Sequence, residues 1–213
     1  MNISSLQYIT NGKTENEILD EVNSVLNAGV NWVQLRIKNT ELDVLTIAKK
    51  VKALCENKST FILNDHVEIV KSINADGVHL GLGDMSIEAA RKILGPSKII
   101  GGTANTKGDC LKRIKYGADY IGLGPFRHTT TKKKLSPILG ITGYQSMLNE
   151  EITIPVVAIG GIRLADLVDL KNETEVHGVA VSSLIGLSNN KDVLIKSIRE
   201  IWKGEHMYVP LSK

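Results

Sequence analysis

Eight short apolar runs, each followed by a segment of helical pattern, are the sequence feature that most constrains the fold. The runs are rich in β-branched residues, and most carry apolar residues at consecutive positions, as strands covered on both faces do. They lie at 6–10, 32–36, 60–63, 77–80, 98–101, 120–122, 156–159 and 178–181. Apolar residues repeat at helical spacing in 15–28, 41–56, 67–72, 86–94, 107–116, 142–148, 164–170 and 191–203.

Eight strand–helix units in 213 residues predict an α/β fold, a single (β/α)8 TIM barrel. A doubly wound open sheet is the second choice. No linker or shift in composition divides the chain, so we expect one catalytic domain over 1–213, with 204–213 as a tail. Thr14 is placed to cap the first helix, and Glu17 follows three residues later.

Composition limits the classes of partner. The net charge is only +3, the lysines are scattered and aromatic residues make up 4%, so we expect no nucleic acid partner. No apolar run approaches the roughly 18 residues that span a bilayer, and no signal peptide is visible. Cys55 and Cys110 lie far apart in predicted helices, which favours reduced thiols in a cytoplasmic protein. A homo-oligomer remains open.

The segment 124–134 follows an apolar run and contains three hydroxyl groups and three ammonium groups. These are Thr129, Thr130, Thr131, Lys132, Lys133 and Lys134. Hydroxyl donors and cations beyond the end of a rigid strand can bind an anion. The alternative is a solvated basic loop.

In such a barrel the active site lies at the carboxyl ends of the strands. The second run ends in Gln34, Arg36 and Lys38, and strand alternation places these three on one face, with Leu35 and Ile37 on the other. An amide and two cations at the barrel mouth suit a polyanion or a polar ring. The alternative is an amphipathic strand with its polar face outward.

Two carboxylates follow neighbouring strands. Asp65 comes after the third run and Asp84 after the fourth. With cations and hydroxyls around them, two carboxylates predict Mg²⁺, which takes its other ligands from water and substrate phosphates. The alternative for each is a helix N-cap, although Ser86 is the better cap for the helix after Asp84.

Histidines offer weaker signals. His79 lies inside a strand pattern and is predicted to be a hydrogen-bonded interior residue, whereas His66 is predicted to lie at the surface or behind the site. The roles of Arg127 and His128 stay open.

The remaining strand ends are small or polar. Thr103 follows the fifth run, Gly161 the seventh, and Ser182 and Ser183 the eighth. A glycine loop after strand seven and a polar turn after strand eight match the common phosphate site of these barrels. The mouth then holds this site and a cationic one, formed by Arg36, Lys38, Asp65, Asp84 and Lys132. We therefore expect two phosphorylated substrates, one of them carrying a diphosphate that leaves.

The sequence resembles the thiamine-phosphate synthase family, also called thiamine-phosphate pyrophosphorylase, from about Tyr8 to Trp202. Five motifs carry the resemblance, and their order makes it specific. They are Gln34-Leu35-Arg36-Ile37-Lys38; Asn64-Asp65; Gly77-Val78-His79-Leu80-Gly81 with Asp84; Gly122-Leu123-Gly124-Pro125 with Thr129-Thr130-Thr131-Lys132; and Ala158-Ile159-Gly160-Gly161-Ile162.

The resemblance implies an enzyme that joins 4-amino-5-hydroxymethyl-2-methylpyrimidine diphosphate to a thiazole phosphate, which is carboxylated in many members. Diphosphate leaves first, and the thiazole nitrogen captures the pyrimidine carbocation. By motif, Asp65 and Asp84 would bind Mg²⁺, and Arg36, Lys132 and Thr103 would be catalytic, with Thr103 beside the pyrimidine. The pyrimidine diphosphate would contact Gln34, Leu35, Arg36, Ile37, Lys38, Asn64 and Lys132. The thiazole phosphate would contact Thr129, Thr130, Thr131, Gly161, Ser182 and Ser183.

Several positions depart from the family pattern. Thr130 stands where Glu is common, Arg127 and His128 replace a more apolar pair, Asn105 replaces a frequent His, and Thr103 replaces a frequent Ser. The alternatives are a thiazole tautomerase, a sugar-phosphate isomerase with Asp65 and Asp84 as an acid/base pair, and a non-catalytic barrel that binds thiamine precursors.

Overall fold

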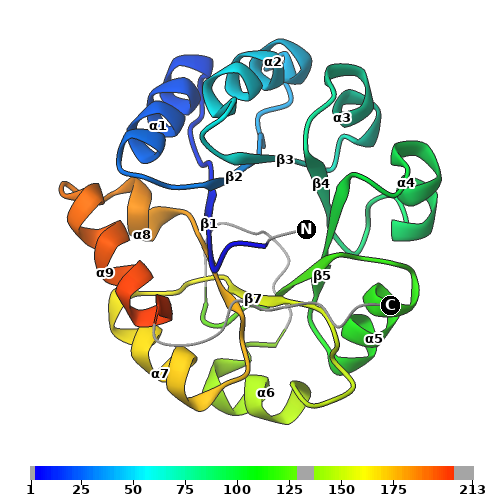
Figure 1. Cartoon of the computed structure of the whole chain (residues 1–213), viewed down its shortest axis with the longest axis vertical. Coiled ribbons are helices and arrows are strands. Elements are labelled where there is room, and N and C mark those ends of the chain that lie inside the picture. The colour runs from blue at the N-terminus through cyan, green and yellow to red at the C-terminus, as the bar shows by residue number, and fades with distance from the viewer. Residues whose placement is uncertain (1–2, 129–136, 204–213) are drawn as a thin grey trace.

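Eight parallel strands close into a barrel in which spatial neighbours follow chain order (Figure 1). The computed structural model describes residues 3–128 and 137–203. Strand β1 pairs in parallel with both β2 and β8, which closes the ring and excludes an open sheet. The predicted (β/α)8 barrel is confirmed. The strands are β1 Leu6–Ile9, β2 Trp32–Leu35, β3 Thr60–Asn64, β4 Gly77–Leu80, β5 Ile99–Ala104, β6 Tyr120–Leu123, β7 Val156–Ile159 and β8 Gly178–Val181.

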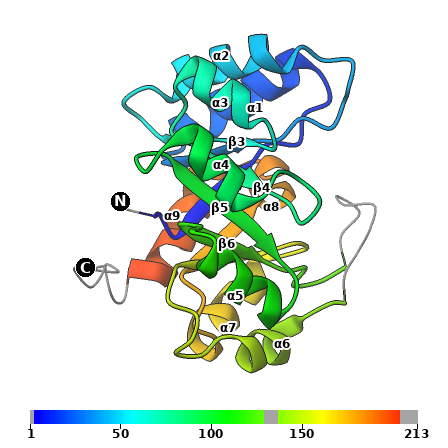
Figure 2. The same cartoon turned by 90° about the vertical axis from the view of Figure 1, so that its right-hand side faces the viewer.

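Helices surround the barrel on all sides, as the end view and the side view both show (Figures 1 and 2). They are α1 Glu15–Asn27, α2 Val44–Cys55, α3 Val67–Ile73, α4 Ile87–Leu94, α5 Lys107–Lys115, α6 Gly140–Met147, α7 Leu167–Glu173, α8 Ser183–Gly186 and α9 Lys191–Lys203, with a 3₁₀ turn, η1 Leu164–Asp166. All eight predicted helices are present within a few residues of their expected bounds. The short α8 was not predicted, because one turn of helix has no periodicity to detect.

Local capping explains where several helices begin. The Thr14 hydroxyl accepts a hydrogen bond from the Glu17 backbone N–H at 3.2 Å, as predicted. Ser86 caps α4 through the Ala89 N–H, and Thr106 forms a capping box with Asp109 at α5. These side chains satisfy N–H groups that the first turn of a helix leaves without partners.

The core has two shells. A large shell lies between the strands and the helices and includes Val33, Leu35 and Val22. A small one fills the barrel and consists of Trp32, Ile62, Ile99, Tyr120, Val157 and Ala180. The side chains of the inner shell fill the centre of the barrel, so a ligand can enter only on the side where the carboxyl ends of the strands lie.

Both cysteines are buried and free, as predicted. Burial raises the pKa of the Cys55 thiol to about 12 and that of Cys110 to about 11, which keeps both thiols protonated and unreactive. Within 3–128 and 137–203, none of the helices combines the length and apolarity that a membrane crossing requires.

Candidate active site

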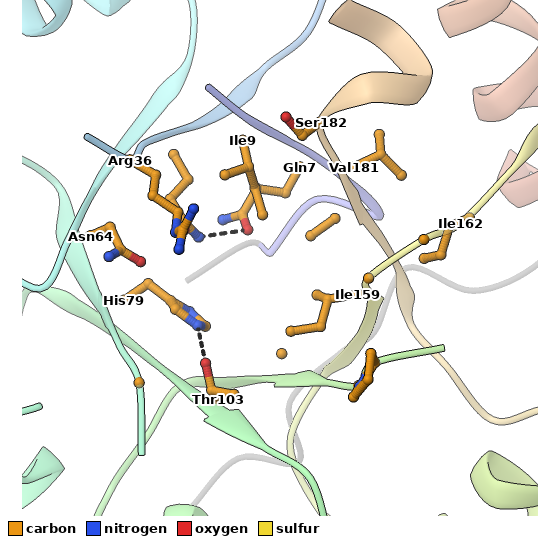
Figure 3. A pocket seen from close by; sticks show the side chains of 18 of the residues that line it. Gln7, Ile9, Arg36, Asn64, His79, Thr103, Ile159, Ile162, Val181 and Ser182 are labelled. Atoms are coloured by element: carbon orange, nitrogen blue, oxygen red, sulfur yellow. Dashed lines mark hydrogen bonds between the residues drawn. The ribbon is translucent and has the colours of Figure 1, made fainter. Parts of the chain in front are cut away.

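A pocket of about 570 Å³ opens at the carboxyl ends of the strands. Every one of the eight strands, or the loop that follows it, contributes to its wall (Figure 3). It is lined by nine of the residues that the sequence singled out: Gln34, Arg36, Asn64, Asp65, Asp84, Thr103, Gly161, Ser182 and Ser183. The structure therefore brings together side chains that are up to about 150 positions apart in the sequence.

Some predicted residues do not line this pocket. Leu35 is fully buried in the outer shell of the core, and Ile37 packs against that shell. Lys38 is exposed and is not among the lining residues. Thr129, Thr130, Thr131 and Lys132 lie outside the described residues.

Strand β2 directs its polar residues into the barrel. Gln34 is 2% exposed, and its amide lies inside the barrel beside Gln7, so the alternative of an outward polar face is wrong. The Arg36 backbone N–H donates to the Thr10 hydroxyl at 2.9 Å, which fixes the end of the strand. Burial lowers the pKa of the Arg36 guanidinium, while the charges of Asp65 and Asp84 act in the opposite direction.

The two carboxylates meet at the pocket rim. Asp65 follows β3 with a left-handed backbone (φ 68°), an unfavourable conformation for a residue with a side chain. Its N–H donates to the His79 carbonyl at 3.0 Å, and one Asp84 carboxylate oxygen accepts from the Gly81 N–H at 2.6 Å. Lost hydration, together with the hydrogen bond and repulsion from Asp84, raises the pKa of Asp65. Because Asp65 is exposed, water moderates that shift.

Neither aspartate is a helix cap. The residue at the N-cap of α3 is His66, which makes no side-chain capping bond, and the cap of α4 is Ser86. Helix capping therefore does not account for either carboxylate. The backbone strain at Asp65 points the same way, because such conformations cluster at functional sites.

The donor set suits a hard divalent cation. Two adjacent carboxylates repel each other, and a cation between them would remove that repulsion. In the part of the chain that the structure describes, no group of three or more His, Cys, Asp or Glu residues could hold a metal. Mg²⁺ commonly uses one or two protein carboxylates and takes its other ligands from water and substrate phosphates. Asp65 and Asp84 fit that pattern.

Helix α5 supports the Asp84 loop from outside the barrel. The Arg113 guanidinium donates to the Gly81 carbonyl at 3.0 Å and to the Thr103 carbonyl at 2.9 Å. Gly102 leaves room for this side chain, since a Cβ there would lie 2.7 Å from Arg113 Cδ. Arg113 thus joins the ends of β4 and β5. The sequence did not single it out, because an arginine on an otherwise polar helix carries no visible signal.

A neutral wall lies across the pocket, after β7 and β8. Gly161 has φ 72°, and a Cβ there would lie 2.9 Å or less from the carbonyls of Arg127 and His128, so only glycine fits. The Ser182 hydroxyl is buried and has no hydrogen-bond partner among the described residues. A buried polar atom without a partner at a pocket wall is a place for a ligand atom.

The start of the 124–134 segment is anchored to this wall. The Phe126 N–H donates to the Ile159 carbonyl at 2.8 Å, and the Arg127 N–H donates to the Gly160 carbonyl at 3.0 Å. These two backbone hydrogen bonds continue the pairing of β6 with β7 beyond the ends of the strands. Arg127 also forms an ion pair with Asp166. Arg127, one of the departures from the family pattern, therefore holds the base of this segment.

Asn105, another departure from the family pattern, is also accommodated. Its side chain is 8% exposed, lines the pocket and donates to the Gly124 carbonyl. It therefore links the end of β5 to the start of the 124–134 segment.

A buried polar layer forms the pocket floor. His79 is 6% exposed, with one ring nitrogen 3.0 Å from the Tyr120 hydroxyl, which confirms the predicted interior role. The other ring nitrogen lies 3.0 Å from the Thr103 hydroxyl (Figure 3). Gln7 and Tyr120 belong to the same layer and were missed in the sequence. Alternation in β1 could have identified Gln7, because it is the polar residue of an otherwise apolar run.

Comparison with known proteins agrees with this geometry. A family model described as thiamine monophosphate synthase matches residues 6–185. A thiamine-phosphate synthase of Flavobacterium johnsoniae is 50% identical over 203 residues, covering 92% of this chain and 95% of that protein. One from Phocaeicola vulgatus is 48% identical and covers 84% of this chain and 89% of its own length.

Solved structures show the same fold. The thiamine phosphate pyrophosphorylase of Pyrococcus furiosus superposes with a TM-score of 0.78 at 30% identity, over 93% of this chain and 95% of that one. A KGPDC structure from Streptococcus mutans, at 11% identity and a TM-score of 0.71, shares the fold alone. The match of family model, sequence and structure over nearly the whole barrel shows that this chain belongs to the thiamine monophosphate synthase family.

Proposed function

We propose that this protein is a thiamine-phosphate synthase that joins an aminopyrimidine methyl diphosphate to a thiazole phosphate and releases diphosphate. One observation carries the proposal: a single pocket has a charged wall with Arg36, Asp65 and Asp84 on one side and a neutral, glycine- and serine-lined wall on the other. The first suits a metal-bound diphosphate and the second a monophosphate. Membership of the family, with relatives named for this activity, supports the same reading.

The diphosphate binds beside Arg36 and Asn64, with Lys132 as a further cation. Asp65 and Asp84 hold Mg²⁺, which when bound neutralises the charge that grows on the departing diphosphate. Arg36 is already partly desolvated, so water screens its charge less than it would at the surface. These groups lower the barrier to breaking the bond between carbon and the diphosphate oxygen.

The pyrimidine lies over the polar floor and the thiazole phosphate against the neutral wall. The Ser182 hydroxyl and the backbone at Gly161 bind the phosphate, with Ser183 beside them. By motif, Thr129 to Thr131 contact the same phosphate. The thiazole nitrogen then attacks the pyrimidine carbocation. An amino-substituted ring stabilises that cation by itself, so the chain needs no strong general base.

Purified protein with both precursors and Mg²⁺ tests the proposal, with diphosphate and thiamine phosphate measured together. We expect equal amounts of the two products, no product when either precursor is omitted, and loss of turnover in EDTA. Turnover that persists in EDTA would contradict the metal site. Isomerisation of a carboxythiazole phosphate without the pyrimidine substrate would assign the chain to tautomerase chemistry instead.

A further inference from the structure

Five buried side chains form a continuous hydrogen-bond chain across the pocket floor. Gln34 Nε2 donates to Gln7 Oε1 at 3.0 Å, and Gln7 Nε2 donates to the Tyr120 hydroxyl at 3.3 Å. The same hydroxyl lies 3.0 Å from His79 Nδ1, and His79 Nε2 lies 3.0 Å from the Thr103 hydroxyl. Each residue is 6% exposed or less, so water does not compete for these bonds.

The barrel is shaped around this chain. A Cβ on Gly101 would overlap the Tyr120 ring, and one on Gly122 would lie 3.1 Å from His79 Cε1. Trp32 packs edge-on against Tyr120, with ring centroids 4.9 Å apart. The two glycines therefore give space to the tyrosine and the histidine, and Trp32 holds the tyrosine in place.

The Tyr120 hydroxyl sets the direction of the chain, because it has a single proton. It accepts from the Gln7 amide, so that proton is free for His79 Nδ1. An imidazole that accepts at Nδ1 carries its own proton at Nε2 and donates it to the Thr103 oxygen. Thr103 lines the pocket, so its own proton is then available to a ligand there. Bonds aligned in one direction in a dry interior strengthen one another.

We propose that Tyr120 is a positioning residue that holds His79 in its neutral Nε2–H form, so that Thr103 acts as a hydrogen-bond donor toward the substrate ring. At the other end Gln34 donates to Gln7, so its own carbonyl oxygen acts as an acceptor. The floor thus offers one acceptor and one donor to a heteroaromatic ring that carries an amine and a bare ring nitrogen. The inference rests on the proposed function for the identity of that ring, but the proton positions can be measured without it.

The first experiment needs no substitution. Histidine labelled with ¹⁵N in the wild-type protein reports the proton on each ring nitrogen, and a His79→Gln sample identifies His79 among the five histidines. We expect a bare Nδ1 and a protonated Nε2. A proton on Nδ1, alone or with one on Nε2, overturns the proposal.

The second experiment compares two buried tyrosines. Tyr120→Phe removes a hydroxyl that belongs to the hydrogen-bond chain. Tyr144→Phe removes a hydroxyl that donates to the Leu123 carbonyl at 2.5 Å and is not part of the hydrogen-bond chain. We expect Tyr120→Phe to populate both forms of His79 and to lower kcat/KM for the pyrimidine substrate about tenfold, the effect of one hydrogen bond. Affinity for inorganic diphosphate with Mg²⁺, which depends on Arg36 and the aspartates, should stay within twofold.

Tyr144→Phe should leave the His79 spectrum and kcat/KM unchanged while lowering thermal stability. Equal kinetic losses in the two variants, or an unaltered His79 in Tyr120→Phe, overturn the proposal. If Tyr120→Phe does not fold, the wild-type spectrum still decides. A wild-type protein that makes no thiamine phosphate but shows the Nε2–H form refutes the proposed function and leaves the role of Tyr120 standing.

Discussion

Two features of Asp65 are energetically unfavourable: its left-handed backbone and the carboxylate that neighbours it. Its φ of 68° and its contact with Asp84 both oppose stability. A residue kept under such strain is typical of a site where function outweighs stability. The consequence can be measured as a dependence of unfolding on pH and Mg²⁺.

We expect the free energy of unfolding of the metal-free protein to fall as the pH rises from about 4 to about 7. Lost hydration and Asp84 raise the pKa of Asp65 to about 7 in the folded protein. Between the ordinary pKa of an aspartate and this value, the folded state therefore keeps a proton on Asp65 that the unfolded state has released, so stability falls as the pH rises. Mg²⁺ binds the ionised pair, so the rise in Tm that it causes should be small at pH 5 and full by pH 8. Thermal melts with and without Mg²⁺ measure this.

Asp65→Asn is the matched control for that titration. It removes the repulsion and keeps the shape of the side chain, so we expect a higher Tm without Mg²⁺ and little further rise when Mg²⁺ is added. Asparagine also tolerates a left-handed backbone well. A wild-type Mg²⁺ effect that is equal at pH 5 and pH 8 would contradict the assignment of the pair.

Lys132 is predicted to act on the departing diphosphate. Lys132→Ala should lower kcat about 10²–10³-fold without a change in Tm, because one cation that stabilises transition-state charge is worth a few kcal/mol. Lys134→Ala removes a neighbouring charge that we expect to be solvated, and it should retain nearly full activity. Comparable rates in the two variants would show that the segment contributes only general positive charge.

Helices α4 and α5 each support the barrel from outside through one arginine, at opposite ends of the barrel. Arg113 on α5 binds the carbonyls of Gly81 and Thr103 at the mouth. Arg91 on α4 binds the Gly95 and Lys98 carbonyls and the Asp119 carboxylate at the other end. The same residue type thus supports function in one place and stability in the other.

We expect Arg113→Met to raise the Mg²⁺ concentration needed for half-maximal activity by about tenfold. The loop that carries Asp84 would lose a charged hydrogen bond worth roughly 1.5–3 kcal/mol, and part of that loss should appear in metal binding. Arg91→Met should lower Tm by several degrees and leave the Mg²⁺ titration unchanged. A reversed pattern in these two assays would refute the role of Arg113.

Closure of the barrel is a property of the whole molecule, and it depends on close approach between β8 and the residues before β1. A Cβ on Gly178 would overlap the Ser5 carbonyl, and the Val179 N–H donates to that same carbonyl at 2.8 Å. The seam between first and last strand therefore has no room for a methyl group.

Gly178→Ala should lower the free energy of unfolding by about 3 kcal/mol or more, because overpacking at a backbone contact cannot relax cheaply. Gly83→Ala places its methyl group in open space and should change stability by less than about 0.5 kcal/mol. Chemical denaturation of both variants tests the comparison. Equal stabilities would mean that the seam tolerates separation.

Much of the fold and part of the site could be predicted from the sequence. The number of strands, their parallel connection and the positions of Gln34, Arg36, Asp65 and Asp84 at strand ends all follow from local periodicity, and the structure bears them out. The Leu35 side chain packs outward into the core, so the predicted contact of Leu35 with a substrate stays a prediction that only its backbone could fulfil. A motif identifies neighbours along the chain, but alternation sends every second side chain away from the pocket.

By itself the sequence determined the repeating strand–helix unit, and with it the end of the barrel at which polar side chains collect. Only the tertiary structure decided which of these side chains meet. Gln7 and Tyr120 are 113 positions apart and His79 and Tyr120 are 41 apart, yet they share one hydrogen-bond chain. The periodicity of apolar residues depends only on neighbours in the sequence. A buried hydrogen bond between distant residues depends on the closure of the barrel, which brings their strands around a common axis.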